Sequence, residues 1–380
     1  MTTETTETAE TAETAETAET AETTAAAPGA GSHDPTPVLR VEALDVVIHP
    51  AHGRPLHVLH DVHLHIDAGE CLGVVGESGS GKSVLSRTIL GVPGRGTRVT
   101  RTGRVLLHDE DILDVDARRR AGLLGTEIAM VHQDPMTSLN PVVRIADQVT
   151  EALTARRRLR RRERRRAAAE LLAAVDVPDP DRRARAYPHE LSGGLRQRVG
   201  IAAALAGEPA LVLADEPTTA LDVTVQRTVL DLLDRHRAER GLATLLITHD
   251  IGLLYGRARR IAVMYAGHIV ETGRTEDVTD RPAHPYTAAL LRSVPRVTGP
   301  LRRTLPTIPG APPDPTRPRT GCPFAPRCDR ATEQCTRATP PVHHAGAGHT
   351  ASCFHPLSHP DTDPRGASAA PNPAPRKATS

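Results

Sequence analysis

The chain has 380 residues, and its 47 Lys and Arg nearly balance its 46 Asp and Glu. That balance does not favour nucleic acid or an acidic partner, and a chain with no Trp, two Phe and four Tyr is poorly equipped to stack bases. No apolar run reaches the about 18 residues that span a membrane, and no secretory signal opens the chain. We therefore expect a cytoplasmic protein of one large domain with an appendage, or of two modest domains, whose five cysteines are reduced unless they bind a metal.

The two ends of the chain have little to bury. Residues 1–37 begin with a repeat that reads ETAETAETAETAET, and residues 356–380 are rich in Pro, Ala and Ser. Such compositions predict disorder, because they lack the apolar side chains that offset the entropy of folding.

Between these tails the pattern is that of an α/β fold. Short apolar runs at 71–75 (CLGVV), 211–214 (LVLA) and 244–248 (TLLIT) have the length and branching of buried parallel strands, and longer helical stretches separate them. A sheet with helices on its faces follows from this alternation. Beyond about residue 275 Pro, Gly and Cys become dense, so we expect a main domain at 38–275 and a small appended module at 276–355.

The stretch GESGSGKS fits the phosphate-loop pattern G-x-x-x-x-G-K-[ST] between a predicted strand and a predicted helix. The residues expected around a nucleotide here are Gly76, Glu77, Ser78, Gly79, Ser80, Gly81, Lys82 and Ser83. The glycines allow backbone N–H groups to face a phosphate at a helix N-terminus, and the Ser83 hydroxyl is a ligand for Mg²⁺. Lys82 is one of only two lysines in an arginine-rich chain, which is explained if a slim ammonium must reach between phosphates.

Four further stretches carry candidate chemistry. LVLADEP (211–217) ends an apolar strand with Asp215, a Mg²⁺ ligand, and Glu216, which would polarise the attacking water; the bland alternative is a helix-capping pair. LSGGLRQR (191–198) places Ser192, Gly193 and Gly194 at a helix start, where N–H groups meet phosphate. VHQDP (131–135) and LLITHD (245–250) each follow a strand with one polar residue, Gln133 and His249; each is unremarkable alone.

In this order and spacing the five stretches resemble the nucleotide-binding subunit of ATP-binding-cassette (ABC) transporters, with LSGG-x-R-Q-R as the specific element. The resemblance implies that ATP and Mg²⁺ are the cofactors and that Ser83, Gln133 and Asp215 surround the metal. The roles that it implies are these: Lys82 and Ser83 in Walker A, Asp215 and Glu216 in Walker B, Gln133 in the Q-loop, Ser192, Gly193 and Gly194 in the signature, Asp222 in the D-loop and His249 as the switch histidine.

The family mechanism closes two cassettes on two ATP molecules. This chain has one Walker A and one signature, so the resemblance implies a second cassette, identical or homologous, and a helical subdomain at about 134–200. The aromatic residue that stacks on adenine in the family is missing from 49–61, where His49 and His52 are the candidates.

Several longer stretches narrow the resemblance. VHQDPMTSLNP, ADEPTTALDVTVQ, HPYTAALLRSVP (284–295), IPGAPPDP and GCPFAPRC resemble the ATPases of oligopeptide and dipeptide importers over residues 38–355, and nickel importers share much of this. The resemblance implies a peripheral subunit on the cytoplasmic face of the membrane with two permease subunits and, indirectly, an extracytoplasmic binding protein. The residues themselves assign no chemistry to HPYT or IPG, whose bland interpretation is packing of a proline-rich extension.

Four cysteines crowd into the predicted appendage: Cys322, Cys328, Cys335 and Cys353. In a reducing compartment they favour a metal over disulfides. Their spacing lacks the close C-x2-C pairs of most zinc sites, and thiolate-only ligation suits a [4Fe–4S] cluster, which the family resemblance also supports. Zinc, with nearby His343, His344, His349 and His355 as further ligands, and free thiols are the alternatives.

The run ARRRLRRRERRRAAAELL (155–172) favours a solvated helix, because AAAELLAAV continues it as an amphipathic stretch; anionic lipid and nucleic acid are the alternatives. For the whole chain, a transport motor competes with a soluble ABC ATPase of assembly or repair and with a binding-only cassette. The single cassette and HPYT favour the motor, and Glu216 with His249 argues against mere binding. We expect no nucleic-acid partner.

Overall fold

The structure is a computed structural model that describes residues 37–92, 98–133, 138–218, 223–294, 307–317 and 320–357. Nearly all residues of the two predicted disordered tails lie outside these ranges. Asp222 also lies outside the described residues. Within the described ranges no helix combines the length and the apolar character that crossing a membrane requires.

The larger sheet contains eight strands in the order β11-β12-β10-β9-β3-β8-β7-β6. Their bounds are β3 Cys71–Val75, β6 Ile128–Val131, β7 Leu211–Asp215, β8 Ala243–Thr248, β9 Arg260–Tyr265, β10 His268–Arg274, β11 Val342–Gly346 and β12 His349–Ser352. The three strands predicted from apolar runs are confirmed as β3, β7 and β8. They pair in parallel, and their residues are buried because both faces of the sheet are covered.

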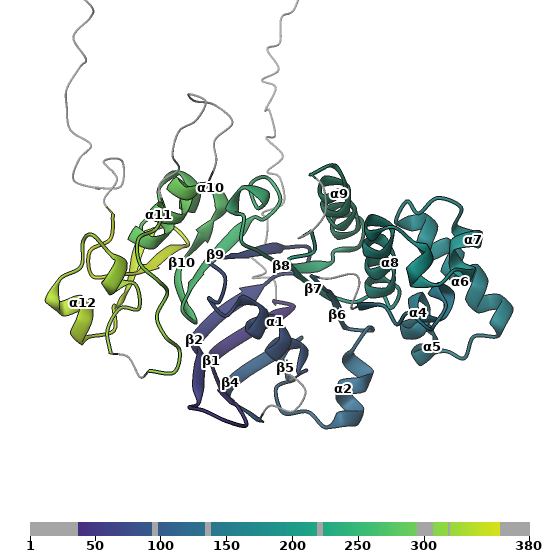
Figure 1. The fold of residues 1–380 in the computed structure, drawn as a ribbon, viewed down its shortest axis with the longest axis horizontal. Coiled ribbons are helices and arrows are strands. Elements are labelled where there is room, and N and C mark those ends of the chain that lie inside the picture. The colour runs from purple at the N-terminus through teal and green to yellow at the C-terminus, as the bar shows by residue number, and fades with distance from the viewer. Residues whose placement is uncertain are drawn as a thin grey trace, which may run out of the picture. The chain divides into compact units, whose positions relative to one another are not determined.

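A second, antiparallel sheet has the order β2-β1-β4-β5. Its strands are β1 Leu39–His49, β2 Leu56–Ile66, β4 Arg98–Leu107 and β5 Glu110–Asp111. The inner face of this sheet shares one apolar cluster with β3, β7 and β8 and with helix α1 (Lys82–Leu90), which contributes Leu85 and Ile89. In Figure 1, α1 is drawn over β1, β2 and β4.

Helices α4 to α8 follow β6 along the chain and occupy much of the predicted subdomain at 134–200 (Figure 1). The helices are α2 Ala117–Leu123, α4 Ile145–Val149, α5 Glu151–Arg156, α6 Arg161–Ala174, α7 Pro180–Arg185, α8 Gly193–Leu205, α9 Val223–Arg240, α10 Thr275–Asp280, α11 Pro285–Ser293 and α12 Glu333–Arg337. The arginine run is not one helix, since α5 ends at Arg156 and α6 begins at Arg161. Ala168 and Leu172 are buried while the arginines of α6 are mostly exposed, as the solvated interpretation expects.

The C-terminal module continues the main sheet instead of forming a core of its own. Strand β12 pairs with β10, and Tyr286 and Phe324 belong to the same apolar cluster as the helices of the subdomain. A buried carboxylate holds the junction: Glu271 on β10 accepts N–H groups from Ala283 at 2.7 Å and His284 at 2.9 Å, and its Oε1 lies 2.7 Å from His349 Nε2. A buried carboxylate needs such partners, because its desolvation is otherwise not offset.

Replacing Glu271 with Ala should therefore destabilise the module strongly. Two buried N–H groups and His349 lose their acceptor, so we expect the free energy of unfolding to fall by about 3 kcal/mol. Calorimetric melting checks this, with Glu239→Ala on the exposed end of α9 as the matched control. Equal melting temperatures for both variants would contradict the role given to Glu271.

Candidate active site

The phosphate loop lies between β3 and α1, as predicted. Gly76 is required by close packing, since a Cβ there would lie 2.0 Å from the Met264 carbonyl oxygen on β9. Gly81 has φ of +105°, a conformation that glycine adopts without strain, and it caps α1. The loop curls around Lys82, whose Nζ donates to the carbonyl oxygens of Gly76 at 2.7 Å and Glu77 at 2.9 Å. Because its ammonium is buried, the pKa of Lys82 is lowered from its ordinary value.

The predicted Mg²⁺ ligands Ser83 and Asp215 are in contact. Ser83 Oγ, in the first turn of α1, donates to Asp215 Oδ1 at 3.0 Å, at the end of β7. Burial raises the pKa of Asp215, an effect that the hydrogen bond from Ser83 partly offsets. A divalent cation bound here would favour the ionised carboxylate, so the pair has the chemistry of an oxygen-ligand metal site.

The three residues predicted to be catalytic converge on one carboxylate. Glu216 Oε2 accepts from Gln133 Nε2 at 3.1 Å and lies 3.3 Å from His249 Nδ1. These residues follow β7, β6 and β8, because the carboxyl ends of parallel strands meet at one edge of a sheet. Glu216 has φ of +47°, a strained backbone for a residue with a side chain, and such strain concentrates at functional sites.

The signature stretch opens α8 and faces outward. Ser192 caps the helix by accepting from the Leu195 N–H at 3.4 Å, and both Ser192 and Gly193 are exposed. The side chain of Ser192 is engaged within α8 itself and not by the phosphate loop of the same chain. The helix N-terminus is therefore available to a ligand from outside the chain.

A cleft of about 490 Å³ runs beside the phosphate loop. Glu77, Ser78, Gly79 and Ser80 line it together with His57, Val58 and the extension segment 312–317. Neither predicted adenine-stacking histidine lines this cleft, and His49 Nε2 is 2.9 Å from Thr100 Oγ1 across the outer sheet. The histidines that do line the cleft are His57, His60 and His268, which sequence reasoning did not single out.

The C-terminal module reaches the phosphate loop through Arg327, a residue that sequence reasoning missed. Its five N–H donors are all satisfied. The acceptors are both carboxylate oxygens of Glu77 (2.7 and 3.0 Å), Tyr265 Oη (3.2 Å) and the carbonyl oxygens of Ile308 (3.1 Å) and Pro309 (2.8 Å). The Arg327 side chain is only 4% exposed.

The sequence stretches HPYT, IPG and GCPFAPRC, to which sequence analysis assigned no role in ATP binding, thus come together around Glu77 and its partner Arg327. Tyr286 of HPYT accepts the Glu77 N–H at 2.8 Å through its hydroxyl, and its own N–H is accepted by His284 Nδ1 at 3.0 Å. The IPG stretch supplies carbonyls, and GCPFAPRC supplies Arg327. No local pattern marks Arg327 as a functional residue, because its partner lies 250 residues away in the sequence.

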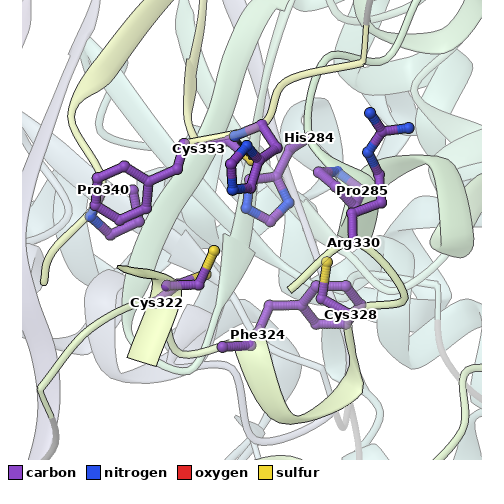
Figure 2. Close-up of a pocket in the computed structure, with 12 residues that line it drawn as sticks. His284, Pro285, Cys322, Phe324, Cys328, Arg330, Pro340 and Cys353 are labelled. Atoms are coloured by element: carbon purple, nitrogen blue, oxygen red, sulfur yellow. Dashed lines mark hydrogen bonds between the residues drawn. The ribbon is translucent and has the colours of Figure 1, made fainter. Parts of the chain in front are cut away.

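All four predicted cysteine ligands line one small cavity with Phe324, His284 and His355. Figure 2 shows Cys322, Cys328 and Cys353 around this cavity. The cysteines form no disulfide. Burial raises the pKa of Cys322 to about 11 and raises the pKa values of Cys328 and Cys353, so without a metal these groups are neutral thiols.

A strand–loop–helix phosphate site with an acid pair, a glutamine and a histidine around it defines a P-loop ATPase of the ATP-binding-cassette type. Comparison with protein families agrees. The family "ABC transporter" matches residues 59–219, and the family "Oligopeptide/dipeptide transporter, C-terminal region" matches residues 270–335.

Individual proteins extend the match over most of the chain. The oligopeptide transport ATP-binding protein OppD of Bacillus subtilis is 41% identical over 310 residues, which cover 82% of this chain and 86% of OppD. The dipeptide transport ATP-binding protein DppD of the same organism is 41% identical over 318 residues, covering 83% of this chain and 94% of DppD. The chain belongs to this family of ABC transporter ATP-binding proteins.

The solved structures give the same fold. The dimeric post-hydrolysis state of the ATP-binding cassette MJ0796, bound to ADP and Pi, aligns with a TM-score of 0.56 and 28% identity. The alignment covers 62% of this chain and 98% of that chain.

Replacing Arg327 with Met should weaken ATP binding although Arg327 lies in the C-terminal module. The change keeps the unbranched apolar stem of the side chain but removes the guanidinium, so the Glu77 carboxylate at the entrance of the loop loses its bidentate partner. We expect the Kd for ATP to rise about 5- to 50-fold, which is the order of a lost charge-assisted pair. Fluorescence titration with a labelled ATP analogue measures the change.

Two further variants control this test. Arg337→Met removes an exposed arginine of the same module and should leave the Kd unchanged. Arg327→Lys should recover little affinity, because an ammonium cannot reproduce five donors in a planar fork. Wild-type affinity in Arg327→Met would contradict the coupling.

Proposed function

We propose that this ATPase powers the import of oligopeptides or dipeptides through a membrane transporter. The observation that carries the proposal is the C-terminal region, residues 270–335, which matches the oligopeptide/dipeptide transporter family and is built into the phosphate site through Glu77. The names of OppD and DppD, which align over most of their own lengths, support peptides as the cargo. A nickel or other small-solute importer is the alternative.

In the proposed mechanism the phosphate loop, from Gly76 to Ser83, binds the triphosphate, and Lys82 leaves its carbonyl acceptors to contact the β- and γ-phosphates. Ser83, Asp215 and Gln133 would hold Mg²⁺, which would neutralise charge on the phosphates. Glu216 would polarise the attacking water, and His249, beside it, would contact the γ-phosphate. The distances among Gln133, Glu216 and His249 support this division of roles.

The proposed working unit contains a second cassette, identical or homologous. Ser192, Gly193 and Gly194 face outward at the start of α8, which suits closure over ATP on another subunit, with Asp222 between the sites. The proposed assembly adds two permease subunits and an extracytoplasmic binding protein that acts through them. The chain would then lie on the cytoplasmic face of the membrane as a peripheral subunit.

Replacing Glu216 with Gln should separate binding from hydrolysis. Gln cannot take a proton from water, so we expect turnover to fall at least about 100-fold while ATP affinity stays within a few-fold. Phosphate release and equilibrium ATP binding measure the two quantities, and Glu239→Gln serves as the control. Turnover that survives the change would mean that another residue is the catalytic acid.

The identity of the transported solute can be tested by measuring uptake of labelled solutes in cells from which the gene for this chain has been deleted. Restoring the wild-type chain should restore uptake of a labelled dipeptide or tetrapeptide, and Glu216→Gln should not. Restored uptake of labelled nickel without peptide would favour the alternative, and no effect on either would favour a soluble role in assembly or repair.

We further propose that Cys322, Cys328, Cys335 and Cys353 hold a [4Fe–4S] cluster. The four thiols share one cavity with apolar walls, which suits the group. Among the described residues no three sulfurs lie within 4.8 Å of one another, whereas a tetrahedral zinc ion needs sulfurs about 3.8 Å apart. In a bound cluster each thiolate would ligate one iron, and the cluster would act as a staple for the module.

Anaerobically purified chain should show broad absorbance near about 400 nm and contain about four irons per molecule. Cys328→Ser should lose both, whereas Cys71→Ala, which alters the buried cysteine of β3, should keep them. If the purified protein is colourless and contains one zinc per chain, the cluster proposal is wrong and the cysteines bind zinc. Because the ligands must lose protons, occupancy should fall as the pH is lowered.

A further inference from the structure

A second group of metal-type ligands lies outside the ATP and cysteine sites. Asp45 on β1 and His57 and His60 on β2 each offer one ligand atom, and these three atoms lie within 4.8 Å of one another. Among the described residues no other His, Cys, Asp or Glu trio meets this condition. Two imidazoles and a carboxylate form a donor set typical of divalent first-row metals.

A bulge in β2 explains why His57 and His60 share a face. Residues three apart on a regular strand point to opposite sides of a sheet. Here the pairing of β1 with β2 shifts where Val46 pairs with Leu59 and Val47 pairs with His57, so Val58 is an extra residue on β2. Leu59 is consequently buried in the core, whereas His57, two residues earlier, is exposed. His60, which follows the buried Leu59, lies on the outer face beside His57, with their ring centroids 3.7 Å apart.

The neighbours of His60 hold its ring in place. His268 stacks on it with centroids 4.4 Å apart and planes 3° apart. Gly267 permits this approach, since a Cβ there would lie 2.7 Å from His60 Cδ2 and 2.3 Å from the Val58 carbonyl oxygen. Burial, with the nearby His57, lowers the pKa of His60 from its ordinary value.

We propose that Asp45, His57 and His60 form a binding site for a divalent transition metal of the zinc type, with water completing its coordination. In the structure His57 Nε2 donates a hydrogen bond to Asp45 Oδ1 at 2.7 Å. Bonds of about 2.0 Å in tetrahedral geometry need ligand atoms about 3.3 Å apart. A small rotation of the exposed side chains therefore exchanges the proton for the ion.

The site is separate from the Mg²⁺ position at Ser83 and Asp215. His57, His60 and His268 line the same cleft as residues 77–80 of the phosphate loop. A bound ion would add positive charge to the wall of that cleft, where an anionic nucleotide enters. Nothing in the proposed transport function requires this ion, so the two proposals stand or fall separately.

Competition between the full chain and a chromophoric zinc chelator, without nucleotide, tests the proposal. The wild-type chain should bind one equivalent of Zn²⁺ more than His60→Gln and Asp45→Asn. Zinc held by the cysteine module is common to all variants and cancels in the difference. His63→Gln is the matched control, because both ring nitrogens of His63 already have partners, Asp61 Oδ1 at 2.9 Å and the Ala43 N–H at 3.4 Å.

Equal zinc binding by wild type and both variants would overturn the proposal. Melting curves without metal verify that each variant is folded. If His60→Gln is not folded, the comparison of zinc binding rests on Asp45→Asn, which is nearly isosteric with the wild type. Anomalous diffraction at the zinc edge gives an independent answer. A peak between His57 and Asp45 is expected, and a peak confined to the cysteine module would contradict the site.

Discussion

The burial of the Lys82 ammonium inside its own loop is the constraint on which the rest of the site depends. A buried cation needs acceptors, and the loop supplies them as carbonyls of Gly76 and Glu77. Those carbonyls can point inward only if the backbone folds tightly against β9. The strand approaches position 76 so closely that there is no space for a Cβ, and only glycine fits. The strand order of the main sheet thus sets the shape of the phosphate loop, and the same sheet edge gathers Asp215, Glu216 and His249 beside it.

The second anchor of the loop comes from the far end of the chain. Arg327 binds the Glu77 carboxylate and lies next to Cys328, one of the four thiols around the cavity. Glu271 ties the same module to β10, so the module is held at two points by buried charge. The cysteine module and the phosphate loop are therefore physically connected, and we expect the module to affect nucleotide binding although it contributes no catalytic residue.

Local patterns predicted a large part of this structure. Strands β3, β7 and β8 were predicted from apolar runs, and the phosphate loop was predicted from its motif. A shared site for Gln133, Glu216 and His249 was implied only by the family resemblance. Pairings between distant segments were not readable: Arg327 with Glu77, or Glu271 with His349, are chosen by tertiary packing. The irregularity of β2 at Val58 was also hidden, because no unusual residue type marks the position where one extra residue brings His57 and His60 to the same face.

The most direct test of the transport account is recovery of the partners of the trapped cassette. Tagged Glu216→Gln chain would be purified from detergent-solubilised membranes with ATP and Mg²⁺, and the proteins bound to it identified by mass spectrometry. The account predicts multi-span permease subunits and a second cassette, recovered with ATP and lost when Ser192→Arg is added to the tagged chain. Recovery of soluble partners or ribosomes alone would contradict the transport role and leave only the ATPase.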